Sequence, residues 1–344
     1  MRDFIGQRRL LARLGERALR GDVAHAYELS GPRSIGKRTL AIRLAQTLLC
    51  PSEPHAAGGC GTCLACRKID HGTHPDVRMV GRLVDLEKEN DRKQIAIEQI
   101  REMQQDLSLR PLEGRWRVVV IDDAADLSEH AEVALLKTLE EPPAHAVLLL
   151  LTTTPAALLE TIRSRLVPFP LRLVSTPEIA EGLADRFGAD ARRHAAAAAG
   201  RPGLGIALAS DDAARKARQA AEAEFYRLVS SGLTERFAWA ADLAESERDT
   251  QRRSQAIEKR LADWCELARD AAVGMDTGSR ALRPDRGSES ARLAKAVSRR
   301  ELVDFALGLE RWRRDAIESN VNARMLLELL VLKLPYAATL REAA

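Results

Sequence analysis

The first 172 or so residues alternate short apolar runs with amphipathic segments, and this alternation constrains the fold more than any other feature. It predicts a parallel sheet covered by helices on both faces, with ligands bound at the C-terminal ends of the strands. Residues 167–171, VPFPL, are expected to add a fifth strand, and their two prolines place it at an edge. The other expected strands are 26–31, 76–81, 117–123 and 146–154, and helical patterns follow at 37–49, 97–109 and 129–141.

Strand-like runs stop after Pro177, and helical patterns rich in Ala, Arg, Glu and Leu continue to the end of the chain. We therefore predict an α/β domain over residues 1–172, a small all-α domain over 173–208 and a second all-α domain over 209–344. The polar stretch 276–292 is expected to be a flexible loop between helices.

The bulk composition argues against two classes of protein but leaves open a local basic surface. The 344 residues carry 53 basic and 50 acidic side chains, a net charge of +3, which argues against binding nucleic acid by bulk charge alone. No run approaches the ~20 apolar residues that a membrane span needs, and the charged N-terminus has no apolar core of a signal peptide. We expect no membrane association and a cytoplasmic location.

A turn that resembles a phosphate-binding Walker A loop follows the first strand and opens a helix. Glycines in such a loop let backbone N–H groups close around phosphates, and the helix N-terminus adds a favourable dipole. Lys37 would reach the β- and γ-phosphates. The alternative is a purely structural Gly-rich turn between strand and helix that binds no nucleotide. The candidate nucleotide-binding residues are Gly31, Ser34, Gly36, Lys37, Arg38 and Thr39.

The loop departs from the motif at Arg38, where a Walker A sequence has Ser or Thr to ligate Mg²⁺ through its hydroxyl. Thr39 is one residue later, which rotates a helical side chain by roughly 100° and moves it by about 1.5 Å. Thr39 would therefore point away from the metal unless the loop shifted its register. We expect ATP and Mg²⁺ to bind weakly, if at all.

Asp122 and Asp123 end an apolar strand, as the acids of a Walker B motif do. The first acid holds Mg²⁺ through water, and the second, normally Glu, positions the attacking water. Asp123 is one methylene shorter, which withdraws the carboxylate by about 1.5 Å and can cost on the order of 100-fold in rate. Taken alone, the pair could instead cap a helix. The substitutions in both nucleotide motifs are thus expected to weaken the chemistry of the site.

Four of the five cysteines fall within residues 50–66: Cys50, Cys60, Cys63 and Cys66. Four thiolates suit a closed, tetrahedral and therefore structural Zn²⁺ site, and in a cytosolic protein such a cluster favours metal over disulfides. A redox Cys-x-x-Cys pair would leave two thiols unexplained, and an iron–sulfur cluster is a further alternative. His55, His71 and His74 are not needed as ligands.

Three strings resemble bacterial DNA polymerase III clamp-loader subunits of the AAA+ family: HAY at 25–27, ALLKTLEEPP at 134–143 and TIRSR at 161–165. The resemblance implies an AAA+ domain with an inserted zinc knuckle, a helical lid and a helical collar that assembles into a five-membered ring. It also implies that Thr153 or Thr154 is the sensor 1 residue. Arg165 would be an arginine finger inserted into a neighbouring subunit's ATP site.

Within that family the altered motifs favour the delta-prime type, which commonly has a degenerate nucleotide site and keeps the finger. The turn at 200–203, GRPG, resembles the lid turn of that type, and no convincing sensor 2 arginine follows it. Such a subunit would help to load the sliding clamp onto primed DNA together with gamma/tau and delta subunits. The alternatives are a gamma/tau-type motor, in which Thr39 and Asp123 suffice for hydrolysis, and a zinc-dependent DNA-binding scaffold. The sequence leaves open whether the chain is itself an enzyme.

Overall fold

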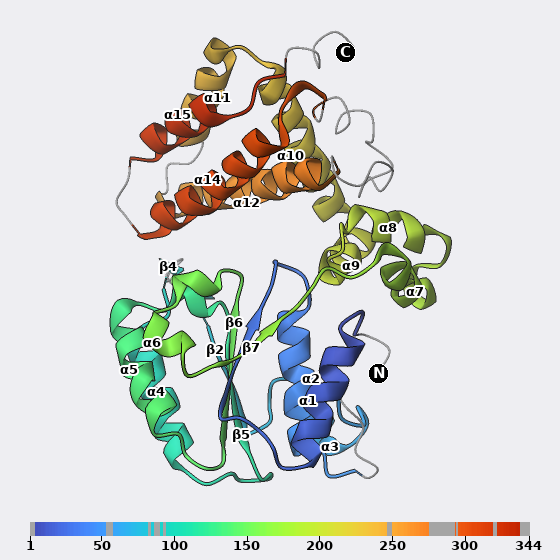
Figure 1. The fold of residues 1–344 in the computed structure, drawn as a ribbon, viewed down its shortest axis with the longest axis vertical. Coiled ribbons are helices and arrows are strands. Elements are labelled where there is room, and N and C mark those ends of the chain that lie inside the picture. The colour runs from blue at the N-terminus through green and yellow to red at the C-terminus, as the bar shows by residue number, and fades with distance from the viewer. Residues whose placement is uncertain are drawn as a thin grey trace. The chain divides into compact units, whose positions relative to one another are not determined.

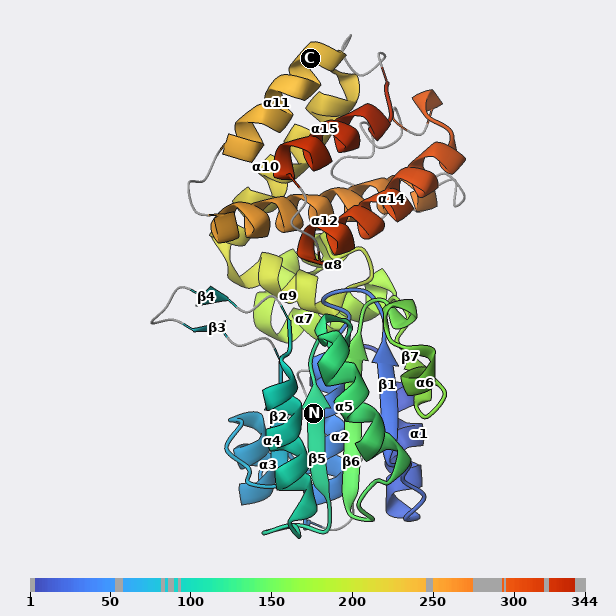
Figure 2. The same ribbon diagram turned by 90° about the vertical axis from the view of Figure 1, so that its left-hand side faces the viewer.

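The computed structural model describes most of the chain, which forms two compact units, Met1–Ile206 and Ala207–Ala344 (Figures 1 and 2). The finer division into domains 1–172, 173–208 and 209–344 stays a prediction. The predicted loop at 276–292 lies outside the described residues. These are 4–52, 58–81, 84–85, 90–91, 94–245, 250–274, 293, 295–318 and 322–337.

The first unit is built on a five-stranded parallel sheet in the order β2–β5–β6–β1–β7. Every residue of β1, β5 and β6 is buried, as expected for central strands covered on both faces. The edge position of β7, with its two prolines, agrees with the prediction. The strands are β1 (Ala26–Ser30), β2 (Val77–Val80), β5 (Arg117–Ile121), β6 (Ala146–Thr152) and β7 (Val167–Pro170).

Alternate strand residues divide between two hydrophobic cores, one on each face of the sheet. Leu149 faces the core that includes residues of α1 and α2, while Leu148 faces the core that includes residues of α4 and α5. Figure 1 shows these two helical layers on opposite sides of the sheet. The helices are α1 (Arg8–Leu19), α2 (Lys37–Leu49), α3 (Leu64–Asp70), α4 (Ile97–Ser108), α5 (Glu129–Glu140) and α6 (Glu160–Arg163).

Short elements that the sequence analysis did not predict connect these layers. Two-residue strands β3 (Val84–Asp85) and β4 (Asn90–Asp91) form a separate antiparallel pair, and strands this short carry no periodicity to read. The 3₁₀ turns η1 (Ala124–Asp126) and η2 (Pro155–Ala157) follow β5 and β6.

The end of the first unit is helical and contacts the phosphate loop. Its helices are α7 (Thr176–Phe187), with Ser175 as its N-cap, then η3 (Gly188–Asp190) and α8 (Ala191–Ala197). Helix α9 (Pro202–Ser210) spans the boundary between the units. The backbone N–H of Gly203, in the first turn of α9, donates to the carbonyl of Ser34 over 2.9 Å.

The second unit is all-α within its described residues, and α12 and α14 lie side by side in it (Figure 2). Stacked rings of Trp239 and Trp264, 4.8 Å apart, lie in its core with Phe225. Its helices are α10 (Asp212–Ser230), α11 (Leu233–Glu245), α12 (Thr250–Gly274), α14 (Arg299–Glu318) and α15 (Ala323–Lys333).

A buried arginine ties two helix ends of this unit together. Arg236, only 3% exposed, donates to five carbonyl oxygens at the ends of α10 and α15. Carbonyls at a helix C-terminus lack intrahelical partners, and the negative end of the helix dipole favours a cation. The five acceptors are the carbonyls of Leu228, Val229, Val331, Leu334 and Pro335.

Replacing Arg236 by Met should lower the free energy of unfolding of this unit by about 3 kcal/mol or more, because it leaves several buried carbonyls without donors. Urea unfolding followed by tryptophan fluorescence, to which the core residues Trp239 and Trp264 contribute, would measure the loss. Arg227→Met is the matched control, since Arg227 makes an exposed ion pair with Glu235 that should contribute about 0.2–1 kcal/mol. Equal losses in the two variants would contradict this account of Arg236.

Candidate functional site

The phosphate loop connects β1 to α2 and is organised around its lysine. Lys37 is buried, and its Nζ donates to the carbonyls of Gly31 at 2.8 Å and Pro32 at 3.2 Å. Burial lowers the pKa of Lys37 to about 8, although nearby Asp123 and Asp122 act in the opposite direction. The ammonium group is thus held by the first two carbonyls of its own loop.

Two residues of the loop have left-handed backbone conformations. Gly36, the N-cap of α2, has φ +104°, which strains any residue with a Cβ. Ser34 has φ +60° and carries the carbonyl that accepts from Gly203. Thr39 lies half-buried in the first turn of α2. The structure therefore brings the predicted loop residues into one turn at the C-terminal end of β1.

Arg38 forms an ion pair with the first acid of the second motif. Its Nη1 lies 3.6 Å from Oδ2 of Asp122, with the two side chains 63% and 33% exposed. Burial and the neighbouring Asp123 raise the pKa of Asp122, while Arg38 and Lys37 oppose that shift. The helix position that would supply a metal-binding hydroxyl supplies a cation instead. These residues therefore do not fit Mg²⁺ in the way an intact pair of nucleotide motifs would.

Asp123 begins the turn η1 with a left-handed backbone, φ +53°, which Asp tolerates better than most residues. Its carbonyl accepts from the N–H of Asp126, but its side chain makes no capping hydrogen bond to η1. The helix-cap alternative considered from the sequence therefore does not describe the side chain of Asp123. Its negative charge instead acts on Lys37, where it raises the pKa of the ammonium group against the effect of burial.

The strand next to the loop, β6, ends at Thr152, and two more threonines follow it. Thr152 is fully buried, its carbonyl accepts from the N–H of Gly31, and its Oγ1 accepts from the N–H of Thr154 at 3.1 Å. Thr153 and Thr154 follow the strand and are half-buried. Their assignment to sensor 1 stays a prediction. Sequence reasoning missed the structural role of Thr152, which fixes the backbone beside the loop.

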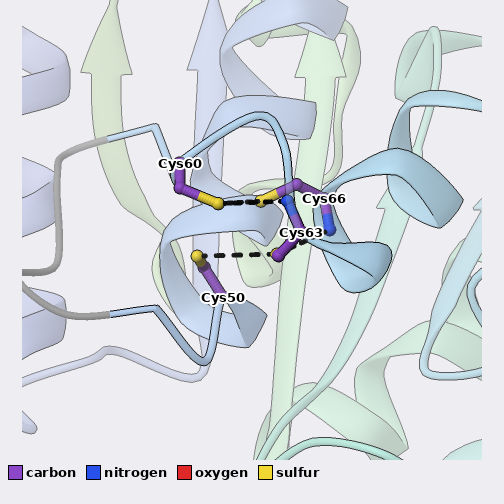
Figure 3. A group of neighbouring side chains, drawn as sticks. All are labelled: Cys50, Cys60, Cys63 and Cys66. Atoms are coloured by element: carbon purple, nitrogen blue, oxygen red, sulfur yellow. Dashed lines mark hydrogen bonds between the residues drawn. The ribbon is translucent and has the colours of Figure 1, made fainter.

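The four clustered cysteines converge between the end of α2 and the start of α3 (Figure 3). All four Sγ atoms lie within 4.8 Å of one another, with Cys50 and Cys63 at 3.9 Å and Cys60 and Cys66 at 4.0 Å. Four bonds of about 2.3 Å in a tetrahedron put sulfurs about 3.8 Å apart. The donor set and its spacing therefore fit Zn²⁺.

Neighbouring groups hold the sulfur atoms in place. Backbone N–H groups of Cys63 and Cys66 donate to the sulfurs three residues earlier, at 3.3 and 3.4 Å. The Ser52 hydroxyl donates to Cys60 and is the largest influence lowering the pKa of that thiol to about 5. Burial raises the pKa of Cys66 to about 12, and a bound metal cation would counter that penalty.

The turn before Cys60 requires glycine. Gly59 has φ +72°, and a Cβ there would lie 2.8 Å from Cβ of Gln46 and 2.9 Å from Sγ of Cys66. Gln46 is itself buried on α2 and donates to the carbonyl of Cys66 at 3.0 Å. The cysteine loop is thus fastened to the helix that begins at the phosphate loop.

Arg165 follows α6 and is hydrogen-bonded on two sides. Its Nη1 donates to the carbonyl of Thr161 at 2.8 Å and to Oγ of Ser164 at 3.3 Å. Its Nη2 donates to Oε1 of Glu140, the last residue of α5, at 2.8 Å. Glu140 belongs to the LLKTLEEPP string, but sequence reasoning did not connect it with Arg165 because the two residues are 25 positions apart.

Comparisons with known proteins bear on the first unit. Residues 6–175 match the family described as DNA polymerase III, delta subunit. The DNA polymerase III subunit delta′ of Pseudomonas aeruginosa is 41% identical over 183 residues, 52% of this chain and 53% of that protein. The subunit tau of Salmonella typhimurium is 38% identical over 177 residues, 52% of this chain and 26% of that protein.

Among solved structures, a DNA polymerase III gamma subunit-related protein of Thermotoga maritima covers 94% of this chain and 97% of its own. The two chains are 15% identical, and the TM-score of their superposition is 0.44. The chain thus spans about half the length of the delta′ relative. It spans about a quarter of the length of the tau relative.

The parallel sheet, its covering helices and the loop between β1 and α2 define an α/β domain with a phosphate-loop-like turn, as the sequence predicted. By these sequence matches, the α/β half of the chain is similar to bacterial DNA polymerase III subunits of the delta, delta′ and tau types. Across the described residues, no helix is both long and apolar enough to cross a membrane.

Substitution of a clustered cysteine should abolish zinc binding. We expect about one zinc per chain in the wild type, and near-complete loss in Cys60→Ser or Cys66→Ser, because three sulfurs leave the tetrahedral site open. Metal content measured by plasma mass spectrometry tests this, with Cys265→Ser as the control that retains zinc. A wild-type chain purified without zinc, and unable to take it up, would refute the assignment.

Arg38→Thr should make nucleotide binding depend on magnesium. We expect Mg²⁺ not to strengthen ATP binding by the wild type, since Arg38 pairs with Asp122 and no hydroxyl is present there. In the variant, Mg²⁺ should strengthen binding by roughly tenfold or more, because the hydroxyl joins a freed carboxylate.

Calorimetry with ATP in Mg²⁺ or in EDTA measures this dependence. Arg33→Thr, an exposed substitution in the same loop, is the control that removes a charge without restoring the hydroxyl. A wild-type protein whose ATP binding needs Mg²⁺ as strongly as the variant's would contradict the expectation.

Proposed function

We propose that this chain is a delta-prime-type subunit of a DNA polymerase III clamp loader, which helps to load the sliding clamp onto primed DNA. It would assemble with gamma/tau-type and delta-type subunits in a five-membered cytoplasmic ring and donate Arg165 to a neighbour's ATP site. Its own ATPase activity would be weak or absent. The observation that carries the proposal is the contrast between an ordered Arg165 and a nucleotide loop whose Arg38 is paired with Asp122.

The proposed role of Arg165 rests on the chemistry of phosphoryl transfer. Charge spreads over the oxygens of the transferring phosphoryl group, and a planar guanidinium with several N–H donors stabilises it. Arginine fingers supplied by a partner contribute 10³–10⁵ in rate. Arg165 lies at the surface, 35% exposed, where a neighbouring subunit's phosphates would have access to it.

The proposal of weak ATPase rests on two substitutions that act on different steps. Arg38 removes a metal-binding hydroxyl and brings a competing cation to Asp122. Asp123 shortens the acid that would orient the attacking water, and its backbone turns away from the strand in a left-handed conformation. Lys37 would bind phosphate by exchanging its contacts with the carbonyls of Gly31 and Pro32 for a phosphate oxygen. Nucleotide binding and hydrolysis are therefore separable in this site.

In this proposal the zinc ion is structural. Cys50, Cys60, Cys63 and Cys66 would hold it, and it would supply a closed tetrahedral link without an open position for substrate. The link would join the end of α2 to α3, next to the Gln46 contact.

A gamma/tau-type motor is the second candidate, and its support is the 38% identity to a tau subunit over the same region. That candidate requires Thr39 to reach the metal and Asp123 to orient water. ATP hydrolysis by the isolated chain at the turnover typical of working ATPases would favour it over the proposal.

Arg165→Ala should slow ATP hydrolysis at the one site that receives this residue by on the order of 10³-fold. In a reassembled clamp loader, this loss appears as removal of that site's share of the total rate, with little change in assembly. Arg163→Ala, two residues earlier and also exposed, is the control and should leave the rate near that of the wild type. If the Arg165→Ala complex keeps the full rate, the proposed finger role fails.

A further inference from the structure

The segment that carries Arg165 is fastened to α5 at both of its ends. At the first end, Oε1 of Glu132 accepts from the backbone N–H of Leu159 at 3.2 Å, just before α6. At the second end, Oε1 of Glu140 accepts from Nη2 of Arg165. Figure 2 shows α5 and α6 as neighbours on one face of the sheet. One helix thus supplies a carboxylate to each end of the segment.

The two carboxylates have different surroundings. Glu132 is buried, and burial raises its pKa, so it serves as an internal anchor for the backbone. Glu140 is at the surface, with 52% of its side chain exposed, and it contacts the guanidinium itself. Of the two carboxylates, only Glu140 contacts the Arg165 side chain, and it acts on the orientation of the guanidinium together with the acceptors of Thr161 and Ser164.

The contacts of Arg165 leave some of its guanidinium N–H donors free to bind a phosphate. The group has five N–H donors in a fixed plane. The hydrogen bonds to Thr161, Ser164 and Glu140 use three of these donors, which leaves two for a phosphate. Holding a flexible side chain in one orientation before it meets its target reduces the entropy lost at that step.

We infer that Glu140 is a positioning residue for Arg165, holding the guanidinium in the orientation in which it meets a neighbouring subunit's ATP phosphates. This inference rests on the proposed role of Arg165 and adds a residue and a contact to it. The pair is solvent-exposed, so its effect on rate should be roughly two- to fivefold.

The test uses the reassembled clamp loader, and the quantity compared is the Arg165-dependent share of ATP hydrolysis. That share is the wild-type rate minus the Arg165→Ala rate. Glu140→Gln should lower it by roughly two- to fivefold in kcat, with KM for ATP changed less than about twofold. Glu140→Asp, which keeps the charge, should recover part of the loss.

Two further variants separate positioning from a general effect of charge or fold. Glu141→Gln removes the same charge from the next residue, which is also exposed, and should leave the rate at the wild-type level. Combining Glu140→Gln with Arg165→Ala should cost no more than Arg165→Ala alone, because the carboxylate acts through the guanidinium. Thermal unfolding midpoints of the single variants should agree with that of the wild type.

Failure of the proposed finger role of Arg165 and failure of the positioning role of Glu140 give different results in these measurements. If Arg165→Ala itself leaves hydrolysis unchanged, the proposed finger role fails first. If Arg165→Ala removes its share but Glu140→Gln leaves that share unchanged, raises it, or lowers it no more than Glu141→Gln does, the inference is overturned.

Discussion

Parallel pairing of β1 and β5 with opposite edges of β6 brings three chain segments to one end of the sheet. In the register, Ser30 lies opposite Thr152 and Ile121 opposite Leu150, so the loop after β1, the acids after β5 and the threonines after β6 are neighbours. All three strands are buried, which fixes this register because a slip would move their apolar side chains to the wrong core. The candidate nucleotide site, the pairing of Arg38 with Asp122 and the packing of α2 all depend on this arrangement.

Charge balance at that end of the sheet explains how the fold tolerates two adjacent acids. Burial disfavours the ionised form of Asp122, and the neighbouring Asp123 adds to this effect, so that the pKa of Asp122 is raised. Lys37 and Arg38 face them from the first turn of α2. In a metal-dependent site a divalent cation would provide part of this compensation. Here the chain supplies the second positive charge itself, through a residue that cannot coordinate a metal.

Predictions from the sequence succeeded where the signal is local. Residues 37–49 were predicted to be a helix and form α2 with the same bounds, and the proline-bearing strand at 167–171 lies at an edge. Cysteine spacing predicted a cluster that the structure brings together. The partners of Arg165 and Arg236 were not predicted, because Glu140 and the helix-end carbonyls approach them only through packing of distant segments. The pairing of β3 with β4 also went unpredicted, since two-residue strands have no pattern.

The sequence by itself determined the α/β class, the phosphate-loop position, the four-cysteine set and the substitution of Arg38 for a hydroxyl residue. These follow from side-chain type and spacing, which are properties of the chain before it folds. Only the tertiary structure decided which carboxylates form ion pairs with Arg38 and Arg165. Arg38 meets Asp122 and Arg165 meets Glu140 because the sheet register and the packing of α5 against α6 bring together residues 84 and 25 positions apart. Ion pairs of this kind depend on distances of a few ångströms, which residue spacing alone does not fix.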